Sequence, residues 1–297
     1  MTKLASDIET SAPPMKQFGK AQVVLEMAWP GSRPVVAHPP RAVSLLMVIW
    51  LSFLSCPAWS EDSSAAQTLP SAADLRLVFD KWGLTARQQG GRPTCSAFTI
   101  AAALEFAVAQ KQQGCERLSV EFLNWASNQI LGQTNDGGMF SNLLKGYETH
   151  GICLEQEMPY RAQFDPSQPP VAEVIATAKS RLGLGLRPHW IKEWDVHTGL
   201  TDEQFLALKR TLSRGWPVCG GFRWPKQQAW ENDVLQMCPP DAVFDGHSVL
   251  LVGYRDDPKQ AGGGVFIIRN SGRGRDDCMP YVYARAYMND AVWIGAD

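Results

Sequence analysis

The chain has 297 residues, of which 45% are hydrophobic and 20% are charged. These proportions are ordinary for a globular protein that buries a sizeable core in one large or two medium domains. The formal net charge of −2 predicts no special partner, and the sequence has neither a basic face for nucleic acid nor a phosphate-binding glycine loop followed by lysine.

Residues 1–60 are predicted to be an export leader. Residues 1–40 are mixed in composition, with six prolines and little periodicity, which disfavours a packed structure. Residues 42–56 then form an apolar run that is short for a membrane span and typical of the hydrophobic region of a secretory signal. Ala58 and Ser60 are small residues at the two positions that a signal peptidase reads, so we expect cleavage after Ser60 and a secreted or periplasmic protein.

Three alternatives for this leader stay open. Translation could start later, for example at Met27, because forty residues ahead of the apolar run are too many for a normal leader. The run could also remain uncut as an N-terminal anchor, the one case in which we expect a membrane contact. Cys56 could instead carry a lipid, although the residues before it fit a lipoprotein signal poorly.

Residues 61–73 are rich in Ser, Ala, Thr and Asp and are predicted to be a linker. Beyond it, residues 89–98 (QGGRPTCSAF) bring a cysteine to the start of an apolar-periodic helix, with Pro93 as a break and Thr94 as a suitable N-cap. A thiol at Cys95 would feel the positive end of the helix dipole, which favours the nucleophilic thiolate. The alternative is a small buried residue in a helix cap.

Further helices are expected where a capping residue precedes an apolar stripe. Ser119 opens one such segment, Gly151 ends another, and Thr201 with Gln204 has the spacing of a capping box. The later part of the chain changes to short apolar runs separated by turn residues. Strands are expected at residues 218–222, 248–254, 265–269, 281–283 and 292–294.

The order of these elements predicts an α+β fold in two lobes, because helices come first and strands second. We expect a mainly helical lobe at residues 74–182 and a mainly β lobe at residues 183–297. Residues 223–245, which include Trp224 and Trp230, are expected to be an ordinary loop of the β lobe or to block one end of a cleft.

Two polar residues stand at the ends of the predicted strands. His247 lies at the mouth of the strand in residues 245–254 (DGHSVLLVGY), and Asn270 ends the strand in residues 265–271 (VFIIRNS). A thiolate nucleophile needs a base, a group that orients the base and a donor for the oxyanion. His247, Asn270 and the side-chain amide of Gln89 are the candidates for these three roles.

With these segments in the order Cys, His, Asn, the chain from residue 74 onwards resembles the papain and cathepsin family of cysteine peptidases. Cys95 and His247 are 152 residues apart and Asn270 follows after 23 more, which suits the family's spacing. The resemblance implies a papain-like fold, in which a helical lobe faces an antiparallel β-barrel-like lobe across a cleft. It also implies hydrolysis of peptide or protein substrates by Cys95, His247 and Asn270, with Gln89 in the oxyanion hole and no cofactor.

The resemblance assigns further residues. Gly137 and Gly138 match a glycine pair that binds substrate backbone, although a loop-to-helix turn that needs glycine explains them equally well. Ser248 stands where the family borders its main specificity pocket. The linker is too short for the long propeptide of many relatives, as in a bacterial type of the family, so a protein inhibitor is one candidate for restraining the activity.

The chain also departs from the family's pattern. Ser96 and Gly272 stand where the family usually has tryptophans, and the second of these shields the bond between asparagine and histidine from water. Unless another tryptophan reaches that bond, we expect it to be weaker. Arg92 and Asn135 occupy the places of two cysteines that the family often bridges, so both partners are missing together.

Three other functions are therefore kept as alternatives. The altered residues Ser96 and Gly272 allow a papain-fold protein that binds peptides without cutting them. A thiol acyltransferase or transamidase would share the chemistry and pass the acyl group to an amine. A peptidoglycan amidase or endopeptidase is compatible with export, although Gln89 and Asn270 favour the papain arrangement.

The remaining cysteines and histidines indicate structural roles. If Cys95 is the nucleophile, five cysteines remain after the leader, an odd number that leaves at least one free thiol in an exported protein. His150, His189 and His197 show no paired spacing with cysteine, so no metal site is expected. We guess bridges between Cys115 and Cys153 and between Cys238 and Cys278, with Cys219 buried in its strand.

Overall fold

The computed structural model describes residues 68–114 and 116–296. The expected leader at residues 1–60 and most of the linker at residues 61–73 lie outside the described residues. Among the helices that are described, none has the length and apolar character needed to cross a membrane.

The described chain contains seven α-helices and nine strands, with two short 3-10 helices. The helices are α1 (Arg76–Lys81), α2 (Cys95–Gln112), α3 (Val120–Leu131), α4 (Phe140–His150), α5 (Ala172–Ser180), α6 (Asp202–Ser213) and α7 (Tyr281–Tyr287), with η1 (Arg181–Leu184) and η2 (Pro240–Ala242). The strands are β1 (Ala72–Asp74), β2 (Leu186–Lys192), β3 (Val218–Pro225), β4 (Trp230–Glu231), β5 (Val234–Leu235), β6 (Val243–Asp256), β7 (Gly264–Asn270), β8 (Arg275–Pro280) and β9 (Met288–Ala296).

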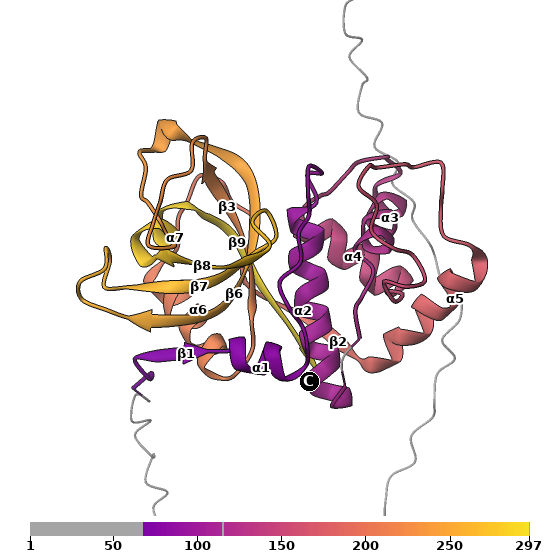
Figure 1. Ribbon diagram of the computed structural model, residues 1–297, viewed down its shortest axis with the longest axis horizontal. Helices are drawn as coiled ribbons and strands as arrows, with labels where there is room; N and C mark the ends of the chain where they lie inside the picture. The colour runs from indigo at the N-terminus through magenta and orange to yellow at the C-terminus, as the bar shows by residue number, and fades with distance from the viewer. Residues whose placement is uncertain (1–67, 115, 297) are drawn as a thin grey trace, which may run out of the picture. The chain divides into compact units, whose positions relative to one another are not determined.

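Helices α2 to α5 lie on one side of a single sheet, and α2 is the helix that faces it (Figure 1). The strand order is β2-β9-β3-β6-β7-β8-β5-β4, with β1 paired to β6. The pairs are antiparallel except for β5 and β8, which run parallel. The predicted α+β class is confirmed. The expected barrel-like lobe is instead an open, mixed sheet, because β2 and β4 end the strand order without pairing to each other.

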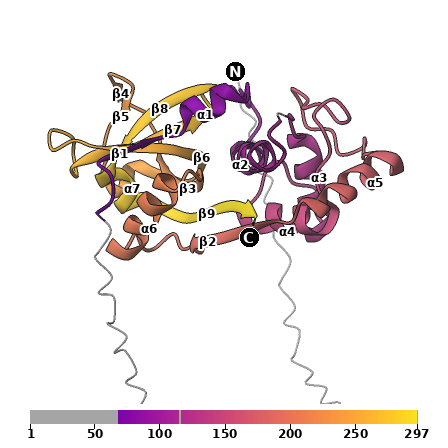
Figure 2. The same ribbon diagram turned by 90° about the horizontal axis from the view of Figure 1, so that it is seen from below.

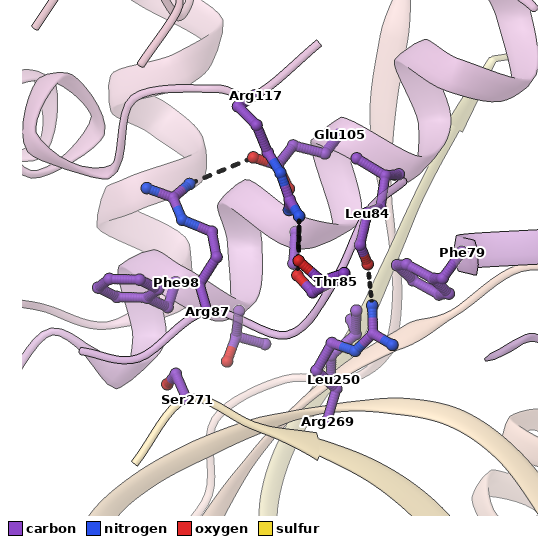
Figure 3. Close-up of a pocket in the computed structure, with 12 residues that line it drawn as sticks. Phe79, Leu84, Thr85, Arg87, Phe98, Glu105, Arg117, Leu250, Arg269 and Ser271 are labelled. Carbon is purple, nitrogen blue, oxygen red and sulfur yellow. Dashed lines mark hydrogen bonds and ion pairs between the residues drawn. The ribbon is translucent and has the colours of Figure 1, made fainter. Parts of the chain in front are cut away.

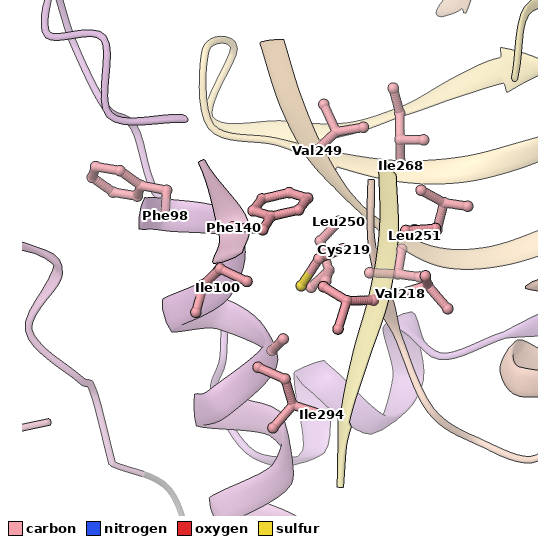
Figure 4. Packing of buried hydrophobic residues seen from close by; sticks show 14 of the residues in the cluster. Phe98, Ile100, Phe140, Val218, Cys219, Val249, Leu250, Leu251, Ile268 and Ile294 are labelled. Carbon is pink, nitrogen blue, oxygen red and sulfur yellow. The ribbon is translucent and has the colours of Figure 1, made fainter. Parts of the chain in front are cut away.

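Helix α2 is the central element of the core. The turned view shows it between the sheet and the other helices (Figure 2), and 14 of its 18 residues are buried, so it has apolar contacts all round rather than one apolar stripe. Its residue Ile100 packs with Val218 and Leu251 of the sheet in one apolar cluster (Figure 4). Cys219 of β3 lies in the same cluster as a fully buried free thiol, which confirms its expected place.

The predicted caps form as expected at three of the four helix ends. The Ser119 hydroxyl accepts a bond from the backbone N–H of Phe122, Thr201 and Gln204 form a complete capping box, and Gly151 follows the last residue of α4. Thr94 is the N-cap residue of α2, but its side chain does not cap the helix. Its hydroxyl is instead hydrogen-bonded to the hydroxyl of Tyr160 at 2.7 Å.

Two secondary-structure expectations are wrong. Residues 281–283 form the start of helix α7 rather than a strand, because Pro280 is the N-cap residue and the Tyr281 and Tyr283 hydroxyls bind Asp256 and the Arg223 carbonyl. The segment at residues 223–245 is not one loop. It completes β3, forms β4, β5 and η2, and begins β6, so that Trp224 belongs to the sheet.

The guessed disulfides are also wrong where the structure describes both partners. Cys238 and Cys278 are both free thiols. Cys278 lies on β8, where it is the strand partner of Val234 on β5. Cys153 is likewise free and packs in a small apolar cluster with Phe122 and Met158. Its guessed partner, Cys115, lies outside the described residues.

Candidate active site

Cys95 is the first residue of α2 and lies against the strand that carries His247. Its thiol is mostly buried, with the residue 8% exposed, and Sγ is 3.8 Å from the carbonyl oxygen of Gly246 on β6. This contact joins residues 151 positions apart in the chain. The packing of α2 on β6 therefore brings the predicted nucleophile next to the residue that precedes the predicted base.

His247 is held by the residue that was predicted to orient it. Its Nε2 lies 2.9 Å from Oδ1 of Asn270, which is 1% exposed at the end of the neighbouring strand β7. The same Oδ1 also accepts the backbone N–H of Gly272 at 3.0 Å. With Nε2 engaged by Asn270, the other ring nitrogen, Nδ1, is the one available to a thiol.

A tryptophan does shield this pair, and it comes from a different part of the chain. The ring of Trp224 on β3 packs against the His247 ring at 4.5 Å between centroids, and Trp224 is 1% exposed. A Cβ added at Gly272 would lie 3.2 Å from Asn270 Oδ1 and 3.3 Å from His247 Cε1. The backbone at Gly272 thus covers the pair closely, in a space too tight for a comfortable side chain.

Burial controls the ionisation of the two reacting groups. It raises the pKa of the Cys95 thiol, although hydrogen bonds from Ser248 and Ser96 oppose this. Burial also lowers the pKa of His247, against the bond to Asn270. Burial therefore acts against the charged form of each group, while the hydrogen bonds to Cys95 and His247 act in favour of it.

Gln89 bridges the nucleophile segment and the end of β7. Its Nε2 donates to the carbonyl of Arg92 at 2.8 Å, its Oε1 accepts from the Ser271 hydroxyl at 2.8 Å, and its backbone N–H donates to the Ser271 carbonyl at 3.0 Å. One amide hydrogen is thus engaged within the chain, and no hydrogen bond of the other to a described residue is seen. The structure places Gln89 beside the residue that follows Asn270.

Gly137 and Gly138 lie against the nucleophile segment. Gly137 has a φ of +87°, and a Cβ there would lie 2.1 Å from the carbonyl oxygen of Pro93. Its N–H donates to Asn124 Oδ1 at 2.8 Å, and the N–H of Gly138 donates to the Ser96 hydroxyl at 3.4 Å. Only glycine fits at position 137, so the turn needs this residue whatever its role toward substrate.

Arg92 forms ion pairs that hold the loop containing Gly137 and Gly138 in place. The guanidinium is 5% exposed and donates to Glu121 Oε2 at 2.6 Å, Asp136 Oδ1 at 2.8 Å and the carbonyl of Arg161 at 2.8 Å. It also lies 4.5 Å from the centre of the Tyr160 ring. This Arg92 cluster, formed by Arg92, Glu121 and Asp136, joins position 92, one of the two places of the missing disulfide, to Asp136, the residue after the other place.

A pocket opens beside His247, with a cavity of about 190 Å³. Ser248, which was predicted to border a specificity pocket, lines it, and so does Gly138. The other lining residues come from the start of α4, from β3, β6 and β9, and from the connection after β2: Met139, Phe140, Trp194, Gly221, Phe222, Gly246, His247, Asn289 and Asp290.

A smaller cavity is lined by residues of α2 and of strands β6 and β7 (Figure 3). Its volume of about 20 Å³ is enough for one water molecule. Glu105 is 1% exposed there and forms ion pairs with Arg87 at 3.2 Å and Arg117 at 3.0 Å. Because both arginines already pair with Glu105, this network has a structural role. No group of three or more potential metal ligands occurs within the part of the chain that is described.

Sequence reasoning missed Trp224 and Asp290 as parts of the site. Trp224 could have been suspected because Phe222 and Trp224 alternate along one strand, but the register that places this strand beside His247 is not visible in the sequence. Asp290 carries no motif at all, and it joins the pocket only because β9 pairs with β3.

Comparisons with known proteins agree with this geometry. Xylellain, a cysteine protease from Xylella fastidiosa, matches with a TM-score of 0.59 and 25% identity over 77% of this chain and 87% of its own. Digestive procathepsin L 3 of the Tenebrio molitor larval midgut matches with a TM-score of 0.55 and 19% identity over 78% and 72%, which shows the shared fold. A comparison with curated protein sequences gives no match.

The family model for papain family cysteine proteases matches residues 69–285. This span includes Cys95, His247 and Asn270 and covers well over half of the chain. The chain therefore belongs to the papain family of cysteine proteases.

Proposed function

We propose that this protease cleaves peptide bonds with Cys95 as nucleophile, His247 as base and Asn270 as the residue that orients the base. The observation that carries the proposal is the 2.9 Å bond between His247 Nε2 and Asn270 Oδ1, on the strand whose Gly246 carbonyl lies against the Cys95 sulfur. That bond leaves Nδ1 of the imidazole for the thiol, which is the arrangement that proton transfer requires.

The reaction begins with proton transfer from Cys95 to His247 as the sulfur attacks the peptide carbonyl carbon. The negative charge on the carbonyl oxygen is met by the Gln89 amide and the Cys95 backbone N–H, the two proposed oxyanion donors. His247 then donates its proton to the leaving amine, and water releases the acyl group from sulfur in a second step. We assign Gly138 and Ser248 to substrate contacts because both line the pocket beside His247.

Peptide binding without cleavage is the main alternative, and the packing around His247 weakens one argument for it. That alternative rested partly on Gly272, which leaves the pair of His247 and Asn270 without its usual tryptophan. Trp224 packs on the imidazole instead and Asn270 is 1% exposed, so a tryptophan covers His247 although position 272 is glycine. Transfer of the acyl group to an amine in place of water remains a second outcome of the same chemistry.

The test is covalent labelling with an epoxide inhibitor of papain-type enzymes, followed by peptide mass mapping and by an assay of casein hydrolysis. We expect one adduct, on Cys95, together with casein cleavage that is absent in the Cys95→Ala variant. A folded protein that forms no adduct and cleaves no casein between mildly acidic and neutral pH would refute the proposal. Adding an amine acceptor to the assay would reveal a transferase by the amide that it forms.

Export is a separate proposal, based on the apolar run at residues 42–56 and the small residues Ala58 and Ser60. N-terminal sequencing of the mature chain should begin at Glu61. A chain that retains residues 42–56 and sediments with membranes would support the anchor instead.

A further inference from the structure

Asp290 places a carboxyl group at the pocket beside His247. It lies on β9 opposite Gly221 of β3, and the residue is only 4% exposed. A Cβ at Gly221 would lie 2.0 Å from Oδ1 of Asp290, so the carboxyl group occupies the space that a side chain at position 221 would need. The backbone of Gly221 hydrogen-bonds it there. The pairing of β9 with β3 therefore places a carboxyl group in the wall of the pocket.

The carboxyl group has no cation of its own. Asp290 forms no ion pair with any of the described residues, and burial raises its pKa to about 7, against the opposing effects of Lys192 and Gly221. The positive charge of Lys192 acts on this carboxyl group, but the ammonium donates to the carbonyls of Asn289 at 2.7 Å and Asp195 at 3.0 Å, and it does not line the pocket. A buried carboxylate without a paired cation is costly, and an incoming cation would relieve that cost.

The neighbouring residue adds a second acceptor that lacks a donor. Asn289 lines the same pocket and is 4% exposed, and its Oδ1 is buried without a hydrogen-bond partner among the described residues. Unpaired buried acceptors are uncommon in folded proteins and mark positions where a ligand or ion supplies the donor. Two adjacent residues of β9 that line the pocket thus have a buried side-chain oxygen without a paired cation or donor from a described side chain.

The remaining walls of the pocket are apolar. Met139, Phe140, Trp194 and Phe222 line it, with Met139 and Trp194 about half exposed at its edge. Apolar walls with a carboxyl group at one side suit a side chain that has an aliphatic stem and a charged head. Lysine and arginine are the residues with this construction.

We propose that this pocket binds a basic side chain of the substrate and that Asp290 is the residue that selects it. The inference rests on the proposed function, since it names the class of peptide that the same site cleaves. His247 lines the pocket as well, so the basic residue is held close to the bond that is cut. The substrates are then peptides with lysine or arginine at one fixed position near the cleavage site.

The test compares kcat/KM for a positional-scanning set of fluorogenic peptides that carry lysine, arginine or the uncharged norleucine at each position. We expect a preference of about 10- to 100-fold for the basic residue at one position, the range for a hydrogen bond to a charged group. Asp290→Asn, which keeps the size of the side chain, should abolish that preference. Asp195→Asn is the matched control, because it removes one negative charge nearby from a side chain outside the pocket and should keep the preference.

Two results would overturn the inference. One is a wild-type enzyme that prefers norleucine or shows no preference at every position, and the other is an Asp290→Asn variant that keeps the basic preference. The preference should also grow as the pH rises through about 7, because Asp290 loses its proton there. Besides Lys192 and the backbone of Gly221, the buried thiol of Cys219 interacts with this carboxylate, whose negative charge raises the pKa of the thiol.

Failure of the proposed function would give a different pattern. In that case casein is not cleaved, and binding is measured directly on the Cys95→Ala variant by saturation-transfer NMR. Nα-acetyl-lysine methylamide should give a signal that the norleucine analogue lacks and that Asp290→Asn removes. Equal signals from the two probes would reject the selective pocket even where cleavage cannot be measured.

Discussion

Replacing Arg92 by methionine should destabilise the protein by about 3–5 kcal/mol, the range for removing one partner of a buried ion pair. The substitution keeps an unbranched side chain of about the length of the arginine's aliphatic stem and removes the charged guanidinium. It leaves the carboxylates of Glu121 and Asp136, whose side chains are 4% and 15% exposed, without the cation that faces both. The loss therefore arises from two poorly hydrated negative charges rather than from lost packing.

The assay is urea unfolding followed by tryptophan fluorescence, with thermal unfolding as a second measure. For a domain of this size, 1 kcal/mol corresponds to roughly 2–4 °C in Tm, so the Arg92→Met variant should melt about 6–20 °C lower. Arg76→Met is the control, because Arg76 pairs with Asp74 on the surface, where their side chains are 47% and 39% exposed. Removing an exposed pair of this kind should cost about 1 kcal/mol or less.

The two variants separate the effect of burial from the effect of losing an arginine. If Arg92→Met and Arg76→Met lose the same small stability, the Arg92 cluster does not hold the loop and the reasoning is wrong. A readout of the site itself is KM for a peptide substrate, which should rise in Arg92→Met because Gly138, which lines the pocket, is two residues after Asp136, the loop residue that Arg92 binds.

Three further predictions follow from the site. Gln89→Ala should lower kcat about a hundredfold or more, the usual loss for one oxyanion donor, and an unchanged kcat would remove Gln89 from that role. Gly137→Ala should cost at least about 1–3 kcal/mol because its Cβ meets the Pro93 carbonyl at a φ of +87°; Gly91→Ala, with open space around it, is the control in thermal unfolding. Burial raises the pKa of Asp290 to about 7, so the folded chain holds a proton that the unfolded chain has already lost. The stability that this proton contributes is fully present below about pH 4 and is lost as the pH rises through about 7. Urea unfolding should therefore find Asp290→Asn equal to wild type near pH 4 and more stable by up to roughly 4 kcal/mol at pH 8, and equal stabilities at both pH values would contradict the burial argument.

The sequence allowed the main positions of the site to be predicted because each stands at the end of a strongly patterned element. Cys95 follows a break and opens an apolar helix, while His247 and Asn270 begin or end apolar strands. Trp224 and Asp290 could not be found in this way, because their place depends on how β3 pairs with β6 and β9. Strand register of this kind is set by the whole sheet and leaves no local signal.

The wrong predictions have the same origin. Residues 281–283 have the aromatic and branched side chains of a strand, but their hydroxyl partners on other elements favour a helical turn. The thiolate at Cys95 stays a prediction, because burial against β6 raises the pKa that the helix dipole is expected to lower. Local propensity and local charge were sound guides only where tertiary contacts did not oppose them.

The Arg92 cluster also determines under which redox conditions this part of the site can form. A thiol nucleophile must be kept reduced, and conditions that protect it also open exposed disulfides. Every cysteine that the structure describes is a free thiol, and the loop beside Cys95 is fastened by carboxylates and a guanidinium instead. This part of the site needs no oxidant to form, so strong reductants should leave its geometry intact while they preserve the nucleophile.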